Sequence, residues 1–331
     1  MTAGRIGGPI TGRTGPGRDA GGDTVRIRDR RRRRPGTPAP READLLVLSV
    51  IFALLGAASN ATGTVLQRKA ALAVPPEDAL RPRLLVDMLH QSVFLLGILG
   101  VIGAALFQAL ALVSGPLALA QPLFILELPF ALLIALPLLH RTLPRSGWIA
   151  VGCMVVGLAT GLACAAPSGG TAQASLARWI PACIVCLGLV AGAVLLARHR
   201  PSGAPRAALL GTAAAVANAL TAALMKSAAN TFSDHGFGAF ITAWQTYGFA
   251  LCGIGAVFLL ENALQSGSIT ASQPALTLGD AVISLILGIT VYAEHVRTGW
   301  WILPELGAVA LITFGTFYLS KAVPLTRELA G

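Results

Sequence analysis

Long apolar stretches alternate with short polar connectors along the chain from residue 45 onward. Each stretch approaches the roughly 20 residues that a helix needs to cross a hydrocarbon core about 30 Å thick. The stretches cover residues 45–66, 93–113, 117–139, 148–166, 179–197, 207–225, 238–260, 268–293 and 299–320. Because backbone polar groups in lipid must be hydrogen-bonded internally, we expect all of them to be helices. The pattern therefore predicts an all-α polytopic membrane protein with about nine transmembrane helices.

The composition agrees with a membrane protein and argues against a soluble enzyme. Hydrophobic residues make up 54% of the chain and charged residues only 12%, whereas about 25% of a soluble domain is charged. The chain has no P-loop, HExxH or GxSxG motif, and its five histidines include no i, i+4 pair for a metal. We therefore expect neither enzymatic activity nor a cofactor.

The net charge of +10 belongs mainly to an N-terminal tail. Residues 1–41 contain 11 Arg and 3 Asp, a net charge of +8, and are rich in Gly and Pro. Such a segment cannot bury enough apolar surface to fold, so we expect it to be disordered. It would either bind anionic lipid or have no role, including as upstream sequence read from a misassigned start. Residues 42–321 form the predicted transporter domain, and residues 322–331 a short C-terminal tail.

The domain contains an internal repeat. Residues 111–148 align with residues 263–300 without a gap, and 12 of the 38 positions are identical, among them Gln121-Pro122 with Gln273-Pro274. A weaker match places Asn60 and Arg68 on Asn218 and Lys226. Five spans separate the members of each pair, so the halves at about 45–166 and 207–320, joined by the 179–197 helix, would have opposite orientations. Inverted repeats are typical of transporters whose site lies near the membrane midplane.

The loop charges predict the orientation in the plasma membrane. With the N-terminus outside, the inner loops contain 11 Lys and Arg residues and the outer loops 3, which the positive-inside rule favours. The arginine-rich tail argues for the opposite orientation. We expect an outside N-terminus and an inside C-terminus, because the loop signal comes from several separate segments.

The order of these motifs resembles the drug/metabolite transporter (EamA-like) superfamily. The 45–66 span ends in Leu66-Gln67-Arg68-Lys69, and Ser114-Gly115-Pro116 precedes Gln121-Pro122. Over residues 45–320 the chain is similar to the nine-helix branch that includes the NIPA-like magnesium transporters. The resemblance implies a transporter fold with an outside N-terminus. It leaves magnesium open as a substrate, since Gln121 and Gln273 before the prolines depart from that branch.

Acidic residues within the spans are the strongest candidates for function, because a charge in hydrocarbon is costly and normally faces a cavity or a partner. Glu127 and Asp280 each lie six or seven residues beyond a Gln-Pro pair, about 10 Å along a helix. We expect both near the midplane, binding a proton or cation, or alternatively making a structural hydrogen bond. Glu305 is a further candidate, and Glu261 is expected at the interface.

Uncharged polar residues complete the candidate site. Gln121, Pro122, Gln273 and Pro274 occupy repeat-related positions, where a proline frees a backbone carbonyl and a glutamine adds a donor and an acceptor. Asn60 and Asn218 are also repeat-related. The alternatives are a packing kink for the Gln-Pro pairs and interhelical hydrogen bonds for the asparagines. Arg68 and Lys226 are expected to extend to the membrane interface.

The expected function is secondary transport of a small solute by alternating access, coupled to a proton or cation. The alternatives are a magnesium or divalent-cation transporter, with Glu127 and Asp280 as metal ligands, and a non-transporting membrane scaffold. The expected partners are a small-molecule or ion substrate and membrane lipid. Nucleic acid is not expected, and a homodimer remains open.

Overall fold

The computed structural model describes residues 40–72, 91–138, 143–266 and 269–322, and these residues are almost entirely helical. The tail at 1–39 and residues 323–331 lie outside the described residues, and Pro40 and Arg41 already belong to the first helix. The helices are α1 (Pro40–Leu72), α3 (Ser92–Ser114), α4 (Leu117–Leu123), η3 (Phe124–Leu126), α5 (Glu127–Leu138), α6 (Arg145–Ala165), α7 (Leu176–Arg198), α8 (Ala204–Thr242), α9 (Trp244–Ser266), α10 (Ile269–Thr290) and α11 (Ile302–Ala322).

The helices confirm a polytopic membrane protein of the all-α class. Among the described residues, 8 helices are long and apolar enough to cross a membrane by length and composition, with α4, η3 and α5 forming one run from Leu117 to Leu138. The remaining predicted span, at 268–293, is also helical and contains α10. Helix α10 is 22 residues long, and Pro274–Thr290 within it is apolar.

Helix α8 is longer than the sequence predicted. We expected a span at 207–225 and a connector near 230–237, but α8 continues to Thr242 with one interruption, at Gly236, whose φ is +79°. The polar residues that suggested a connector bond within the helix. Asn230 Nδ2 donates to the Lys226 carbonyl at 2.9 Å, and Thr231 Oγ1 donates to the Ser227 carbonyl at 2.9 Å. Satisfied in this way, they do not end the helix.

The helical run that contains Gln121-Pro122 is interrupted just after it. Helix α4 ends at Leu123, and the 3-10 turn η3 separates it from α5. The turn lies between Pro122 and Pro129. A proline has no N–H to donate and its ring crowds the carbonyl four residues earlier, which for Pro129 is that of Ile125 within η3. The repeat-related Pro274 lies within α10, which is continuous from Ile269 to Thr290.

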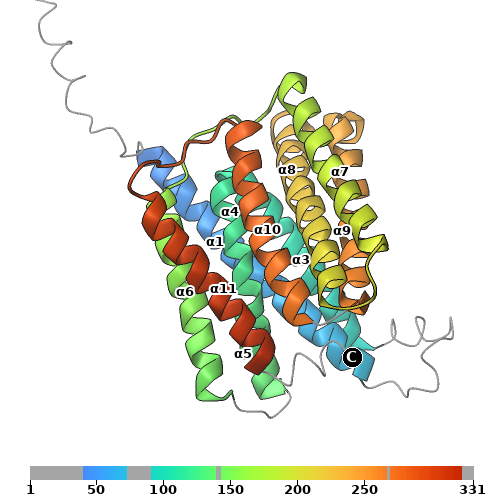
Figure 1. The fold of residues 1–331 in the computed structure, drawn as a ribbon. Helices are drawn as coiled ribbons and strands as arrows, with labels where there is room; N and C mark the ends of the chain where they lie inside the picture. Colours follow the sequence, from blue (N-terminus) through green and yellow to red (C-terminus); the bar gives the residue numbers. More distant parts are fainter. Residues whose placement is uncertain (1–39, 73–90, 139–142, 267–268, 323–331) are drawn as a thin grey trace, which may run out of the picture. The chain divides into compact units, whose positions relative to one another are not determined.

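The most extensive helix contacts are α1 with α3, α8 with α9 and α10, and α6 with α11. Figure 1 shows α6 beside α11, and α8 with its neighbours α7 and α9. Small residues allow the closest approach, as is common between membrane helices. A Cβ added at Gly63 of α1 would lie 2.8 Å from the Gly97 carbonyl oxygen of α3, so the backbones of α1 and α3 are in contact.

Replacing this glycine should destabilise the helix bundle. We expect Gly63→Val to push α3 away from α1, at a cost of about 1–3 kcal/mol, and to lower the thermal unfolding midpoint of the purified protein. The control is Gly188→Val on α7, where an added Cβ meets nothing within 4 Å. Equal midpoints for the two variants would contradict the close packing of α1 on α3.

Candidate functional site

The carboxylate of Asp280 on α10 is the centre of a polar cluster inside the helix bundle. Its Oδ2 accepts hydrogen bonds from Asn218 Nδ2 on α8 at 3.0 Å and from Gln121 Nε2 on α4 at 3.5 Å. Its Oδ1 accepts a bond from Ser284 Oγ at 3.4 Å. Gln108 of α3 extends the cluster, because its Nε2 donates to Gln121 Oε1 at 3.2 Å. The structure therefore brings together three predicted site residues, and they come from both predicted halves.

Glu127, the other predicted acid, has a comparable partner. Its carboxyl group at the start of α5 lies beside the side chain of Asn60 on α1. Each acid is thus paired with an asparagine, and the repeat alignment had matched those two asparagines with one another. The two asparagine–acid pairs come from corresponding helices of the two predicted halves.

The positions of the other predicted site residues say less about function. Pro122 and Pro274 lie within α4 and α10, and the Gln273 side chain lies outside the described part of the structure. Glu305 is in the first turn of α11, and its Oε1 is a buried atom without a hydrogen-bond partner. Among the described residues no hydrogen bond joins Glu305 to Asp280 or Glu127. Glu261 is exposed.

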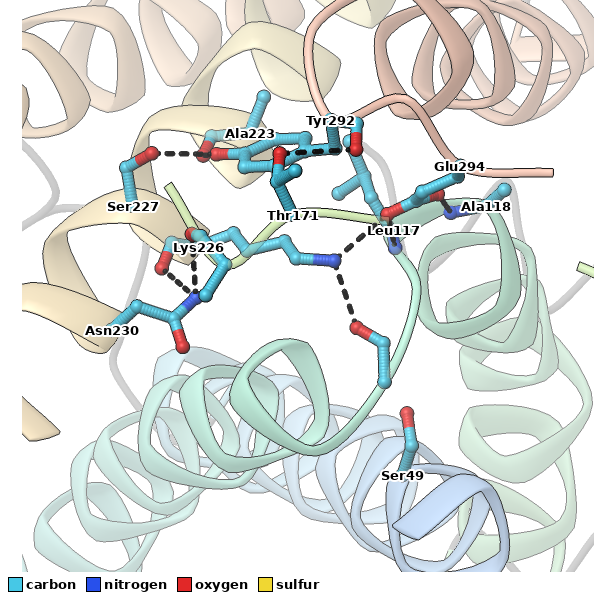
Figure 2. A network of polar contacts seen from close by, with 12 residues as sticks. Ser49, Leu117, Ala118, Thr171, Ala223, Lys226, Ser227, Asn230, Tyr292 and Glu294 are labelled. Atoms are coloured by element: carbon cyan, nitrogen blue, oxygen red, sulfur yellow. Dashed lines mark hydrogen bonds and ion pairs between the residues drawn. The ribbon is translucent and has the colours of Figure 1, made fainter. Parts of the chain in front are cut away.

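A buried ion pair, which the sequence did not predict, joins Lys226 of α8 to Glu294 in the connector between α10 and α11. The Nζ–Oε1 distance is 2.8 Å, and the two side chains are only 7% and 0% exposed. Figure 2 shows the two side chains pointing toward one another. The expectation that Lys226 extends to the membrane interface is therefore wrong, because its ammonium group has a counter-charge inside the protein.

Glu294 also binds the first turn of α4. Its Oε1 accepts a hydrogen bond from the Leu117 N–H at 2.6 Å, and its Oε2 accepts one from the Ala118 N–H at 2.9 Å. These amides have no acceptor within their own helix, and a carboxylate is the favoured group at a helix N-terminus. Lys226 Nζ in turn donates to the Gly115 carbonyl at 2.9 Å. The ion pair thus fixes the entry of the chain into α4.

Tyr292 supports the ion pair from the same connector. Its ring lies 4.8 Å from Lys226 Nζ, and its hydroxyl donates to the Ala223 carbonyl of α8 at 2.6 Å. Ser227 Oγ lies 2.8 Å from that hydroxyl. Burial raises the pKa of Tyr292 above its ordinary value, and the charge of Glu294 raises it further. The hydroxyl therefore remains protonated and able to donate.

One signal in the sequence pointed to this ion pair. A lysine within an apolar span needs a counter-charge, and Lys226 lies at the end of the predicted 207–225 span. Glu294 lies just after the predicted 268–293 span and was not among the acidic candidates. The two residues are 68 positions apart, so local patterns could not join them.

The described residues include no group of three or more His, Cys, Asp or Glu side chains arranged to hold a metal ion. The hydrogen-bond partners of Asp280 are amides and a hydroxyl rather than other carboxylates. Hard cations prefer oxygen ligands, and beside the carboxylate of Asp280 the cluster offers the hydroxyl oxygen of Ser284, with a single negative charge from Asp280.

Comparisons with known proteins identify no family for the chain. No family model matches it, and no solved structure matches it. The chain is similar to an uncharacterised protein of Corynebacterium glutamicum, with 28% identity over 283 residues that cover 83% of this chain and 95% of that protein. The similarity extends over almost the whole relative but indicates no substrate.

Removing one member of the ion pair should cost more stability than removing both. We expect Lys226→Met to leave an uncompensated buried carboxylate, at a cost of about 3–5 kcal/mol, and Glu294→Gln to leave an unpaired lysine. The double variant Lys226→Met/Glu294→Gln should be less destabilised than the sum of the two, measured by thermal unfolding in detergent. Lys69→Met, at an exposed position, is the control. Strict additivity would contradict a direct interaction.

Proposed function

We propose that the protein is a secondary transporter that moves a small solute across the plasma membrane by alternating access, with Asp280 and Glu127 as coupling groups. The observation that carries this proposal is the pair of asparagine–acid contacts, Asn218 with Asp280 and Asn60 with Glu127. Ionisable groups inside a membrane bundle mark substrate or ion pathways. Two such groups with corresponding partners are typical of a site built from two repeats.

The helix neighbours support an inverted repeat. Helix α1 packs on α3 in the first predicted half, as α8 packs on α9 in the second. Helix α1 also contacts the α4–α5 run, as α8 contacts α10. The contacts of α4 with α10 and of α6 with α11 are those expected of elements that face their own counterparts across an axis. This arrangement also agrees with the proposed drug/metabolite-transporter type of fold.

The contact between Asp280 and Gln121 gives the proposal a mechanism. These side chains come from different predicted halves, and their 3.5 Å contact is long. An ionised Asp280 attracts the amide donors of Gln121 and Asn218, whereas a protonated or cation-bound carboxyl attracts them less. Occupancy of Asp280 would therefore change the interaction between the halves, which is the requirement for coupling a driving ion to alternating access.

A divalent-cation transporter is the second candidate function. The oxygen atoms of Asp280 and Ser284 suit a hard cation such as Mg²⁺, whereas Gln121 and Asn218 turn their amide nitrogen atoms toward Asp280. The single carboxylate of this cluster gives the second candidate less support than proton coupling has.

Flux measurements test the role of the two acids. A thermal-shift screen of the purified protein against Mg²⁺, amino acids, nucleotide sugars and cationic drugs identifies a stabilising solute, since a ligand at 100 times its Kd stabilises by about 2.7 kcal/mol. We expect Glu127→Gln and Asp280→Asn to abolish uptake of that solute into proteoliposomes under a proton gradient, because neither amide can exchange a proton.

The control for the flux measurement is Glu261→Gln, which removes a carboxylate from an exposed position. All variants are compared at equal amounts of protein with similar elution on size-exclusion chromatography. Unchanged uptake in both Glu127→Gln and Asp280→Asn would remove the acids from the mechanism. Uptake of Mg²⁺ that saturates without a proton gradient would instead favour the divalent-cation transporter.

The proposed orientation has its own test. A reporter enzyme that is active only in the cytoplasm, fused after Gly331, should be active, because the inner loops would then contain most of the Lys and Arg residues. The same reporter placed after Ser202, in the connector between α7 and α8, should be active as well. Activity of a periplasmic reporter at these positions would reverse the orientation.

A further inference from the structure

We propose that Lys226 and Glu294 form a gate that closes the transport pathway at the end of the bundle where the α10–α11 connector lies. The inference rests on the proposed transport function and assigns to it a second set of residues, distinct from the Asp280 cluster. The ion pair and its hydrogen bonds, called the lock below, hold this gate closed. Breaking them opens that end of the bundle.

The ion pair connects the two predicted halves through its further hydrogen bonds. Lys226 and Glu294 belong to the second half, and the further hydrogen-bond partners of their side chains described above belong to the first. Glu294 binds the amides of Leu117 and Ala118, and Lys226 binds the carbonyl of Gly115. One buried pair of charges thus fastens α8 and the α10–α11 connector to the junction of α3 and α4. Separating the halves at this end requires these contacts to break.

A second connector lies against the gate. The Ser168 N–H donates to the His295 carbonyl at 3.0 Å, and the His295 N–H donates back to the Ser168 carbonyl at 2.9 Å. The Thr171 N–H donates to the Tyr292 carbonyl at 2.7 Å. The α6–α7 connector, which follows the first half, therefore pairs with the α10–α11 connector of the second. The contacts of the gate and of this pairing all lie at the same end of the bundle.

The gate and the Asp280 cluster share their helices. Leu117 and Gln121 are four residues apart on α4, about 6 Å along the axis. Asn218 and Lys226 are eight residues apart on α8, about 12 Å along the axis. A shift of α4 that alters the Gln121–Asp280 contact therefore also moves the amides that Glu294 binds. Protonation of Asp280, or binding of a cation to it, can therefore affect the gate through a single turn of α4.

The repeat places this lock at one end only. In the alignment of residues 111–148 with 263–300, Glu294 corresponds to Thr142, and Lys226 corresponds to Arg68 in the weaker match. Residues 139–144, which correspond to the start of the α10–α11 connector, contain no acidic residue. The cation is thus present in both halves, but its acidic partner is present in only one. Closure by a buried ion pair is a property of the end that contains Glu294.

Glycines make room for the lock. A Cβ at Gly288 of α10 would collide with Glu294 Oε2, and a Cβ at Gly170 would lie 2.8 Å from Glu294 Cγ. Gly170 also has a φ of +100°, a backbone conformation that favours glycine. Helix α10 and the α6–α7 connector are therefore shaped around the Glu294 side chain.

Cysteine accessibility tests the gate without any knowledge of the substrate. The protein is prepared without its native cysteines (Cys153, Cys164, Cys183, Cys186 and Cys252) and with Asn218→Cys, at an exposed position of α8 beyond the gate. A membrane-impermeant thiol reagent is added to either side of sealed vesicles. His295→Cys and Arg200→Cys, both at exposed positions, identify the two sides in separate preparations.

We expect Lys226→Met/Glu294→Gln to raise the labelling rate of the Asn218→Cys protein from the His295 side by about tenfold and to lower it from the Arg200 side, because loss of the lock shifts the population toward the state open at the gate. The matched control Lys69→Met/Glu261→Gln removes the same two charges from exposed positions and should leave both rates unchanged. Lys226→Gln/Glu294→Gln, which removes both charges but keeps polar side chains, provides a second gate variant if the first double variant fails to fold.

Unchanged rates from both sides would overturn the gate. A rise from both sides would show a loosened bundle and would overturn it as well, since only a reciprocal change reports alternating access. The result is independent of the flux measurements. If Glu127→Gln and Asp280→Asn abolish uptake but the gate variant leaves the labelling rates unchanged, the proposed transport function is supported and the gate is contradicted. A reciprocal change with normal uptake in both acid variants would retain the gate and remove the coupling groups.

Discussion

A charged or polar group inside a hydrocarbon layer has no water to bind, so it must find its partner within the protein. The arrangement of this bundle depends on that constraint. Lys226 is held by Glu294, Asp280 by Asn218 and Gln121, and the partners come from different helices. Because each contact requires two segments in a fixed relation, the polar groups help to specify which segments are neighbours, together with the close packing of small residues such as Gly63.

The same constraint applies to the backbone. The first amides of α4 have no acceptor within the helix, and they find one in the carboxylate of Glu294 rather than in water. Glu294 therefore has two tasks, as the counter-charge of Lys226 and as the acceptor at the start of α4. Replacement of the pair by apolar side chains would satisfy the first but leave the amides unsatisfied. This dual role explains why the ion pair lies at the entry to a broken helix.

The length of the apolar stretches predicted the helical spans. The repeat alignment matched Asn60 with Asn218 as corresponding positions of the two halves. Hydrophobic patterns are local, and a repeat is found by comparing the chain with itself, so a single sequence is enough to detect both. The Lys226–Glu294 pair is neither local nor repeated, because its members are distant in the chain and Glu294 has no acidic counterpart in the other half. The length of α8 was also missed, since Asn230 looks like a connector residue until its acceptors, one of them in the α6–α7 connector, are known.

Helix α4 links the two polar networks because it is short and bounded on both sides. Glu294 fixes its first turn, Asp280 contacts its Gln121, and the prolines on either side of η3 separate it from the rest of the run. Pro122 and Pro129 have no N–H to donate, so this run lacks two backbone hydrogen bonds of a continuous helix, and helices bend most sharply at such positions. Tilting α4 would lengthen the Gln121–Asp280 contact and pull the Leu117 amide from Glu294 together. The two networks therefore cannot change independently, which is the condition for a site at the midplane to control access at one end.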